Sequence, residues 1–146
     1  MHDRSRGQAL AEFALILPVF LIFVFAIIDL GRFVYTMNAL SNGAREAARV
    51  GSVGSRPSEC ASLSRQGCIQ LVADDRTWGI PGTVTTNVTC ERVATNGSIS
   101  VVATSTCRTG DLLVVQSETP FAPLTPILGQ VLNVTVSGET RVTVNQ

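Results

Sequence analysis

The side chains that most often perform catalysis are scarce in this chain of 146 residues. It contains one histidine, His2, and no lysine. Ser-His and Cys-His nucleophilic sites, HExxH zinc sites, Schiff-base chemistry and the P-loop therefore lack the residues they need. The neighbouring carboxylates Asp74 and Asp75 would diverge on a helix, as at a solvated helix end. We predict no catalytic residue, metal, cofactor or small-molecule substrate, and expect that the protein is not an enzyme.

The overall charge excludes a second class of protein. Eleven arginines balance eleven acidic residues, so the formal net charge is zero. A nucleic-acid-binding protein shows a basic excess, and we expect no nucleic-acid partner. Only 15% of the residues are charged, against about 25% in average soluble domains. The mean hydropathy is correspondingly high, at +0.31.

The apolar residues are concentrated in one run near the N-terminus. Residues 13–28 carry no polar side chain, and an extension back to residue 9 is interrupted only by Glu12. About 20 apolar residues cross a bilayer as a helix. The alternative is a buried core helix, but so small a domain has too little chain to surround a helix that is apolar on every face. We predict a transmembrane helix over 8–30, followed by an outer domain over 31–146.

The residues that flank this span predict its orientation. Arg4 and Arg6 precede it, whereas Asp29 and Arg32 follow it. Basic residues favour the cytoplasmic side, so we expect the N-terminus inside and the C-terminal domain outside. No A-x-A cleavage pattern follows the apolar run, which indicates that the helix is retained. Pro18 lies within the span and should kink the helix, unless neighbouring contacts accommodate it.

The acidic residue in the apolar run has a specific spacing. A carboxylate inside lipid is costly and usually functional, although at the headgroup level it costs little. A cut after Gly7 would remove a short basic leader, residues 1–7, and place Glu12 fifth in the mature chain. This resembles the processing signature of type IV prepilins. The runs RGQALAEFALILP and DLGRFVYTMNALSNGAREAARV, within residues 6–50, closely resemble the TadE-like family of minor pilins of the tight-adherence (Tad) pilus system.

The resemblance implies a role for each of these residues. A prepilin peptidase would recognise Gly7, and Gln8 would become the mature N-terminus. Glu12 would pair with the free amine of a neighbouring subunit, since an ammonium and a carboxylate offset each other's desolvation and set register between subunits. The alternative is the same pair within one subunit.

The resemblance also implies partners and a function. The partners would be the membrane, other pilin subunits, the Tad-type assembly platform and the prepilin peptidase. The protein would be a minor pilin, or pseudopilin, of the inner membrane that helps assemble or prime a pilus used in adherence, with incorporation into the extracellular pilus as an open question. The competing hypothesis is a single-span anchored extracellular binding module that is independent of pili.

The remaining pattern predicts an α+β fold, in which a long helix over 8–50 packs on a small antiparallel sheet. Small residues recur four apart along its second half, at Gly43, Ala44, Ala47 and Ala48. Such a stripe lets another backbone approach, which favours packing on the sheet and on neighbouring pilins, while helix propensity is the alternative explanation. A short second helix is expected near 59–77. Strands are expected at 84–90, 99–104, 112–115 and 131–145, the last continuous through Gly138 rather than folded into a hairpin.

The proline-rich, apolar segment at 120–128 would connect the last two strands, either as a cover for the core or as a subunit contact. Four cysteines, Cys60, Cys68, Cys90 and Cys107, lie on the predicted outer side, which favours disulfides. A metal site is disfavoured because C-x-x-C spacing is absent. If residues 60–68 were all helical, the first two sulfurs would be about 12 Å apart. We place Cys60 in a loop and favour the sequential pairs, with the two crossed connectivities as alternatives.

Overall fold

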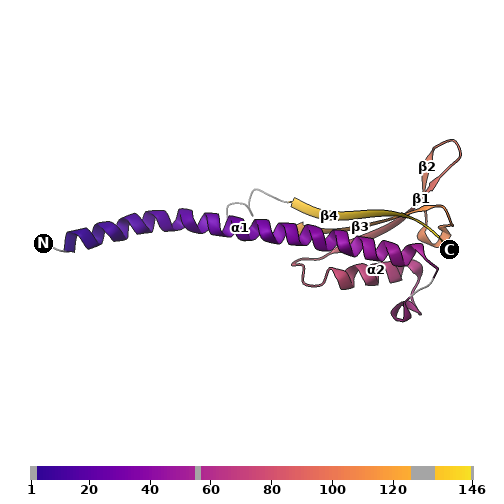
Figure 1. Cartoon of the computed structure of the whole chain (residues 1–146), viewed down its shortest axis with the longest axis horizontal. Helices are drawn as coiled ribbons and strands as arrows, with labels where there is room; N and C mark the ends of the chain where they lie inside the picture. Colours follow the sequence, from indigo (N-terminus) through magenta and orange to yellow (C-terminus); the bar gives the residue numbers. More distant parts are fainter. Residues whose placement is uncertain (1–2, 55–56, 126–133, 146) are drawn as a thin grey trace.

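The computed structural model describes residues 3–54, 57–125 and 134–145. One long helix runs the length of the molecule, and all other elements lie beside its C-terminal half (Figure 1). The helices and strands, in chain order, are α1 (Asp3–Ser52), α2 (Arg65–Arg76), β1 (Thr85–Val93), β2 (Ile99–Val102), β3 (Leu112–Phe121) and β4 (Val134–Thr143), with short 3-10 turns at Ser58–Cys60 and Thr104–Thr106. The predicted α+β fold class is confirmed.

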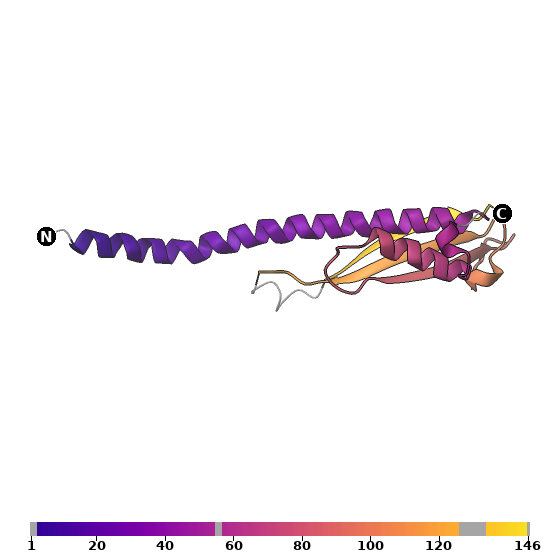
Figure 2. The same ribbon diagram turned by 90° about the horizontal axis from the view of Figure 1, so that it is seen from below.

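Helix α1 contains 50 residues and spans about 75 Å at 1.5 Å per residue. It begins before the predicted start at residue 8 and continues unbroken through Pro18, and Figure 2 shows its N-terminal half gently curved. Only 6% of its most apolar window is buried in the molecule. The alternative of a buried core helix is therefore wrong, and the apolar half of α1 is long enough and exposed enough to cross a membrane.

The strands form one antiparallel sheet in the order β2-β1-β3-β4. Alternate side chains point toward α1 and α2, as the two-residue period of a strand requires. The buried, inward-facing residues are Thr86, Val88 and Cys90 of β1, Leu113, Val115, Ser117 and Thr119 of β3, and Val136 and Gly138 of β4. The core therefore lies between the sheet and the two helices.

Strand β4 runs straight through Gly138, as predicted, with Gly138 opposite Ser117 of β3. Gly138 is needed because β4 comes very close to the backbone of α1 there, and not because the chain turns. A Cβ atom at this position would lie 2.5 Å from the backbone nitrogen of Ser41 and 2.6 Å from the carbonyl carbon of Leu40. The sheet thus contacts the backbone of α1 directly, and the absence of a side chain at Gly138 permits that contact.

Strand β3 is much longer than the predicted 112–115. Its second half is polar, and two hydroxyl groups there point into the core. Ser117 lies 3.1 Å from the Thr86 hydroxyl, and the Thr119 hydroxyl donates to the carbonyl oxygen of Thr83 at 3.1 Å. Hydrogen-bonded hydroxyls can replace apolar side chains in a core. The sequence of this half of β3 therefore lacks the alternation of apolar and polar residues by which a strand is predicted.

Helix α2 is shorter than the predicted 59–77. It begins after Ser64, whose hydroxyl accepts a hydrogen bond from the backbone of Gly67 at 3.1 Å as an N-cap. Residues 58–60 form a separate 3-10 turn. Cys60 therefore lies outside α2, as predicted.

The stripe of small residues on α1 packs within the chain itself. Gly43, Ala44, Ala47 and Ala48 are buried. A Cβ at Gly43 would lie only 3.3 Å from the carbonyl oxygen of Ala73 on α2, so the two helices touch there. The stripe therefore packs inside the folded chain, on α2 and the sheet. The expectation that the same stripe also serves neighbouring pilins needs correction, because α2 and the sheet already cover it.

Candidate functional site

The predicted processing residues lie together on the exposed N-terminal part of α1. Gly7, Gln8 and Glu12 are all exposed, and a Cβ at Gly7 would meet nothing within 4 Å. The side-chain amide of Gln8 donates to the Glu12 carboxylate at 3.1 Å. Because residues four apart share a helix face, the carboxylate lies beside residue 8 of its own chain. This contact is made by the Gln8 side chain and involves no free amine, so both pairings of Glu12 remain predictions.

A second polar group lies at the end of the apolar run, where the sequence marks it only as a flanking charge. Asp29 is just 5% exposed although its neighbours on α1 are apolar. Its carboxylate accepts hydrogen bonds from the backbone nitrogens of Leu124 and Thr125 at 2.8 and 2.9 Å. The Thr125 hydroxyl donates a third, at 2.7 Å. Asp29 thus holds the chain that leaves β3.

Arg32 and Phe33, one turn along α1, complete this contact. The Arg32 guanidinium lies 3.2 Å from Asp29, donates to the carbonyl oxygen of Ala122 at 3.3 Å, and lies 5.6 Å from the centre of the Phe121 ring. The Phe33 and Phe121 rings meet edge to face with centroids 5.5 Å apart. We call this set, Asp29, Arg32 and Phe33 against residues 121–125, the Asp29 clamp. It ties the outer domain to the last turn of the apolar run.

A signal for the clamp was present in the sequence. An ionisable residue at the end of an apolar span is a functional candidate by default, and Asp29 is followed at helical spacing by Arg32. The partner could not be identified, because residues 121–125 lie far along the chain and supply mainly backbone donors. Backbone groups are present at every position and therefore carry no sequence signature.

The disulfides follow the sequential connectivity that the sequence analysis favoured. Cys60 bonds Cys68 with Cα atoms 5.2 Å apart, and Cys90 bonds Cys107 with Cα atoms 5.9 Å apart. The first ties the 3-10 turn to α2, and the second ties β1 to the irregular chain before β3. Each bond therefore fastens a segment with little regular structure to a regular element.

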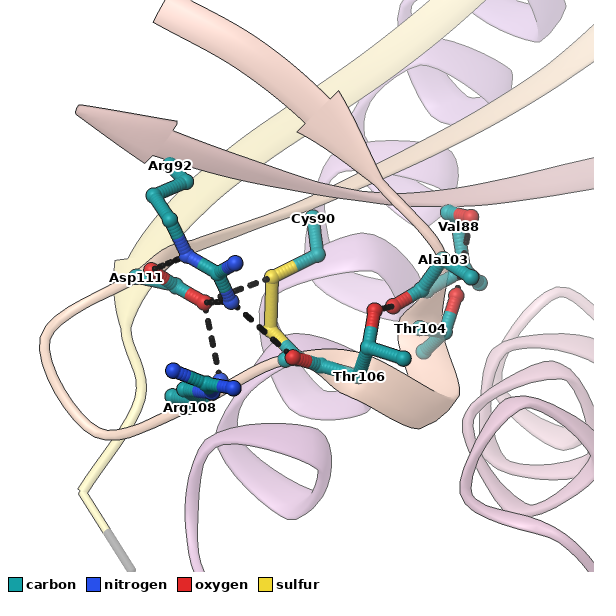
Figure 3. Close-up of a disulfide and its surroundings, with 9 residues drawn as sticks. Val88, Cys90, Arg92, Ala103, Thr104, Thr106, Arg108 and Asp111 are labelled. Atoms are coloured by element: carbon teal, nitrogen blue, oxygen red, sulfur yellow. Dashed lines mark hydrogen bonds and ion pairs between the residues drawn. A yellow bond between two sulfur atoms is a disulfide. The ribbon is translucent and has the colours of Figure 1, made fainter. Parts of the chain in front are cut away.

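An ion pair lies beside the second disulfide (Figure 3). The Arg92 guanidinium binds the Asp111 carboxylate through two hydrogen bonds of 3.0 and 2.7 Å, and the backbone nitrogen of Arg108 donates to the same carboxylate at 2.8 Å. Arg92 also donates to the carbonyl oxygen of Thr106 at 3.0 Å. The Arg92 and Arg108 hydrogen bonds hold the pKa of Asp111 below its ordinary value.

The donor atoms of Cys90, Cys107 and Asp111 lie within 4.8 Å of one another. Metal ligation by cysteine requires a thiolate, whereas these two sulfurs are bonded to each other. The 3.8 Å contact between Cys90 and Asp111 is likewise not a conventional hydrogen bond, because a disulfide sulfur carries no hydrogen. The cluster is therefore a disulfide packed against an ion pair.

The helix is apolar and exposed along its first half and packs on a four-stranded sheet along its second half, which indicates a membrane-anchored α+β protein. Residues 7–49 match the model of the family described as TadE-like protein. The first third of the chain is therefore similar to TadE-like proteins of Tad pilus systems. Comparison with curated proteins and with solved structures gave no match. The matched segment contains Gly7, Glu12 and the α1 side of the Asp29 clamp.

Proposed function

We propose that this chain is a TadE-like minor pilin, a structural subunit that helps to assemble or prime a Tad-type pilus. The observation that carries the proposal is the spacing of Gly7 and Glu12 at the exposed end of an apolar helix, within the matched segment. The prepilin peptidase cuts between Gly7 and Gln8. Helix α1 anchors the product in the cytoplasmic membrane, with the N-terminus inside and the sheet outside.

The exposed half of α1 gives this subunit a means of assembly. Its apolar side chains are exposed in the isolated chain, including Phe13 and Leu15 at 61% and 78%. Lipid covers them in the membrane, and the helices of other subunits cover them in a fibre. Cleavage creates an amine at Gln8, and Glu12 of a neighbouring subunit binds it in this low-dielectric setting, which fixes the register between subunits.

The same proposal assigns no catalytic activity to the protein. The residue types of the chain support this part of the proposal. The chain has no lysine, and its one histidine, His2, lies in the proposed leader. The interaction partners are other pilin subunits, the Tad-type assembly platform and the prepilin peptidase.

Mass spectrometry of the mature protein tests the processing step. We expect an N-terminus at Gln8 in cells with the prepilin peptidase and an uncut chain in cells without it. An N-terminus at Met1 in both strains, or one beyond residue 30, would refute the proposal. An uncut protein that does not depend on pilus machinery would instead favour the anchored binding module.

The role of Glu12 needs a separate test. We expect Glu12→Ala to be cleaved normally, because the peptidase site is intact, but to be incorporated poorly into pili. Glu59→Ala is the matched control, since it removes an exposed carboxylate from the outer domain. Normal pilus yield and incorporation for Glu12→Ala would contradict the register role.

A further inference from the structure

The chain that leaves β3 extends beyond the sheet toward the apolar half of α1. Figure 2 shows this segment, coloured orange, reaching alongside α1 past the near end of the sheet. The hydrogen bonds of Asp29 place Leu124 and Thr125 at the level of that helical turn. The predicted span ends at residue 30. Residues 121–125 therefore lie level with the predicted end of the span.

The surface at this depth is apolar on both the helix and the segment. A groove of about 340 Å³ runs between them. It is lined by Ala26, Leu30 and Phe33 of α1, by Phe121, Pro123 and Val134, and by one charged residue, Asp29, whose carboxylate is tied up in the clamp. Leu124 is 54% exposed beside it. Ala26 and Leu30 belong to the span itself, so the apolar surface of the groove is continuous with the surface that lipid must cover.

The charged groups at this level are arranged to suit a membrane boundary. An unpaired carboxylate facing lipid would be costly, but three donors from Leu124 and Thr125, together with Arg32, satisfy Asp29. The Arg32 side chain remains partly exposed, and its guanidinium lies over the Phe121 ring. A cation at the headgroup level keeps its charge near water in this way, while its stem packs on apolar groups. The clamp thus hides the carboxylate and leaves apolar side chains outward.

We propose that residues 121–125 are a membrane-seated element, and that lipid of the leaflet nearest the outer domain fills the groove between this segment and α1. The occupant is lipid because the groove continues the surface of the membrane span. The proposal depends on membrane anchoring by α1 and not on incorporation into a pilus. The segment would fix how the outer domain sits on the bilayer before assembly.

Tryptophan fluorescence of the full chain in nanodiscs, at one copy per disc, tests this placement. The native Trp78 is 87% exposed, so each variant is made in a Trp78→Phe background. Leu124→Trp reports on the proposed seat, and Val101→Trp, at a site 69% exposed on β2, is the matched control. Phe20→Trp lies within the span and reports on anchoring.

We expect Leu124→Trp to show blue-shifted emission, quenching by lipids with a spin label near the headgroup, and protection from iodide. Val101→Trp should be quenched by iodide and not by the labelled lipids. Quenching of Leu124→Trp by iodide alone would overturn the proposal, and so would protection from both quenchers, which would indicate protein cover. If Phe20→Trp also escaped lipid quenching, the anchor itself would be refuted, so the two failures are distinguishable.

Discussion

At the scale of single residues, the carboxylate of Asp29 holds a segment almost a hundred positions away in the sequence. It accepts three hydrogen bonds from two consecutive residues and lies beside Arg32. Hydrogen bonds to a charged group are stronger than those between neutral groups. The side chain therefore does more than mark the end of the span.

Replacement of Asp29 by asparagine should destabilise the outer domain. An amide keeps one acceptor oxygen but turns an NH₂ group toward backbone donors, so we expect a loss of about 1–3 kcal/mol in the free energy of unfolding. The measurement is thermal or urea unfolding of the full chain in detergent, followed by circular dichroism. Asp75→Asn, at an exposed position on α2, should leave the midpoint unchanged. Equal midpoints for both variants would show that the clamp contributes no stability.

Asp111 should contribute to the pH dependence of stability. Hydrogen bonds from Arg92 and Arg108 lower its pKa from the ordinary value of 3.8. A lowered pKa in the folded state means that this stabilisation is complete above the ordinary pKa and is lost as the pH falls through the folded pKa. We expect Asp111→Asn to be less stable at neutral pH and to lose less stability than the unaltered chain on acidification.

Urea midpoints measured from neutral pH down to about pH 3, below the ordinary carboxyl pKa, test this expectation. Glu59→Gln, in an exposed turn, controls for the removal of a carboxylate and should follow the unaltered chain. A parallel pH profile for Asp111→Asn and the unaltered chain would argue against a role for the Arg92 pair.

At the scale of elements, close backbone contacts determine how α1 fits under the sheet. Gly138 allows β4 to touch α1, and Gly43 allows α2 to touch it from another side. Small residues at such contacts allow short distances between axes and leave few voids. The outer half of α1 is therefore a scaffold for its own domain.

A methyl group at Gly138 would have no space. Its neighbours are backbone atoms of Leu40 and Ser41, which cannot move without shifting the helix. We expect Gly138→Ala to lower the free energy of unfolding by about 1–3 kcal/mol, the usual cost of overpacking. Gly54→Ala, where a Cβ meets nothing within 4 Å, should change it by less than about 0.5 kcal/mol. Similar melting temperatures for the two variants would contradict the close contact.

At the scale of the whole molecule, α1 is a continuous helix that connects the proposed processing site to the outer domain. No break separates Glu12 from Asp29, so the helix transmits its rotation between them. The direction in which Glu12 faces is therefore set by the clamp and by the packing of the sheet. The linkage thus connects the clamp to the register role proposed for Glu12.

One alanine inserted between Phe20 and Leu21 tests that linkage. It rotates the N-terminal part of α1 by about 100° relative to the outer domain. We expect unchanged melting of the outer domain, because the insertion lies outside its contacts, but lower incorporation into pili. A second variant that carries the insertion and also lacks Ile22 restores the rotation and should recover incorporation. Equal incorporation for the single insertion and the unaltered chain would refute the linkage.

The sequence by itself determined the apolar span, the candidate processing residues and the α+β class. Each depends on local composition or short spacing: a run of apolar side chains, the distance from Gly7 to Glu12, and alternation in Thr- and Val-rich segments.

Only the tertiary structure decided which segment packs on which surface. It assigned the small stripe of α1 to α2 and the sheet, extended β3 through Ser117 and Thr119, and placed residues 121–125 on Asp29. These outcomes depend on contacts between segments far apart in the chain, many of them made by backbone atoms. A local pattern shows that a surface can pack, whereas only the folded chain selects its partner, because that choice minimises the free energy of all contacts together.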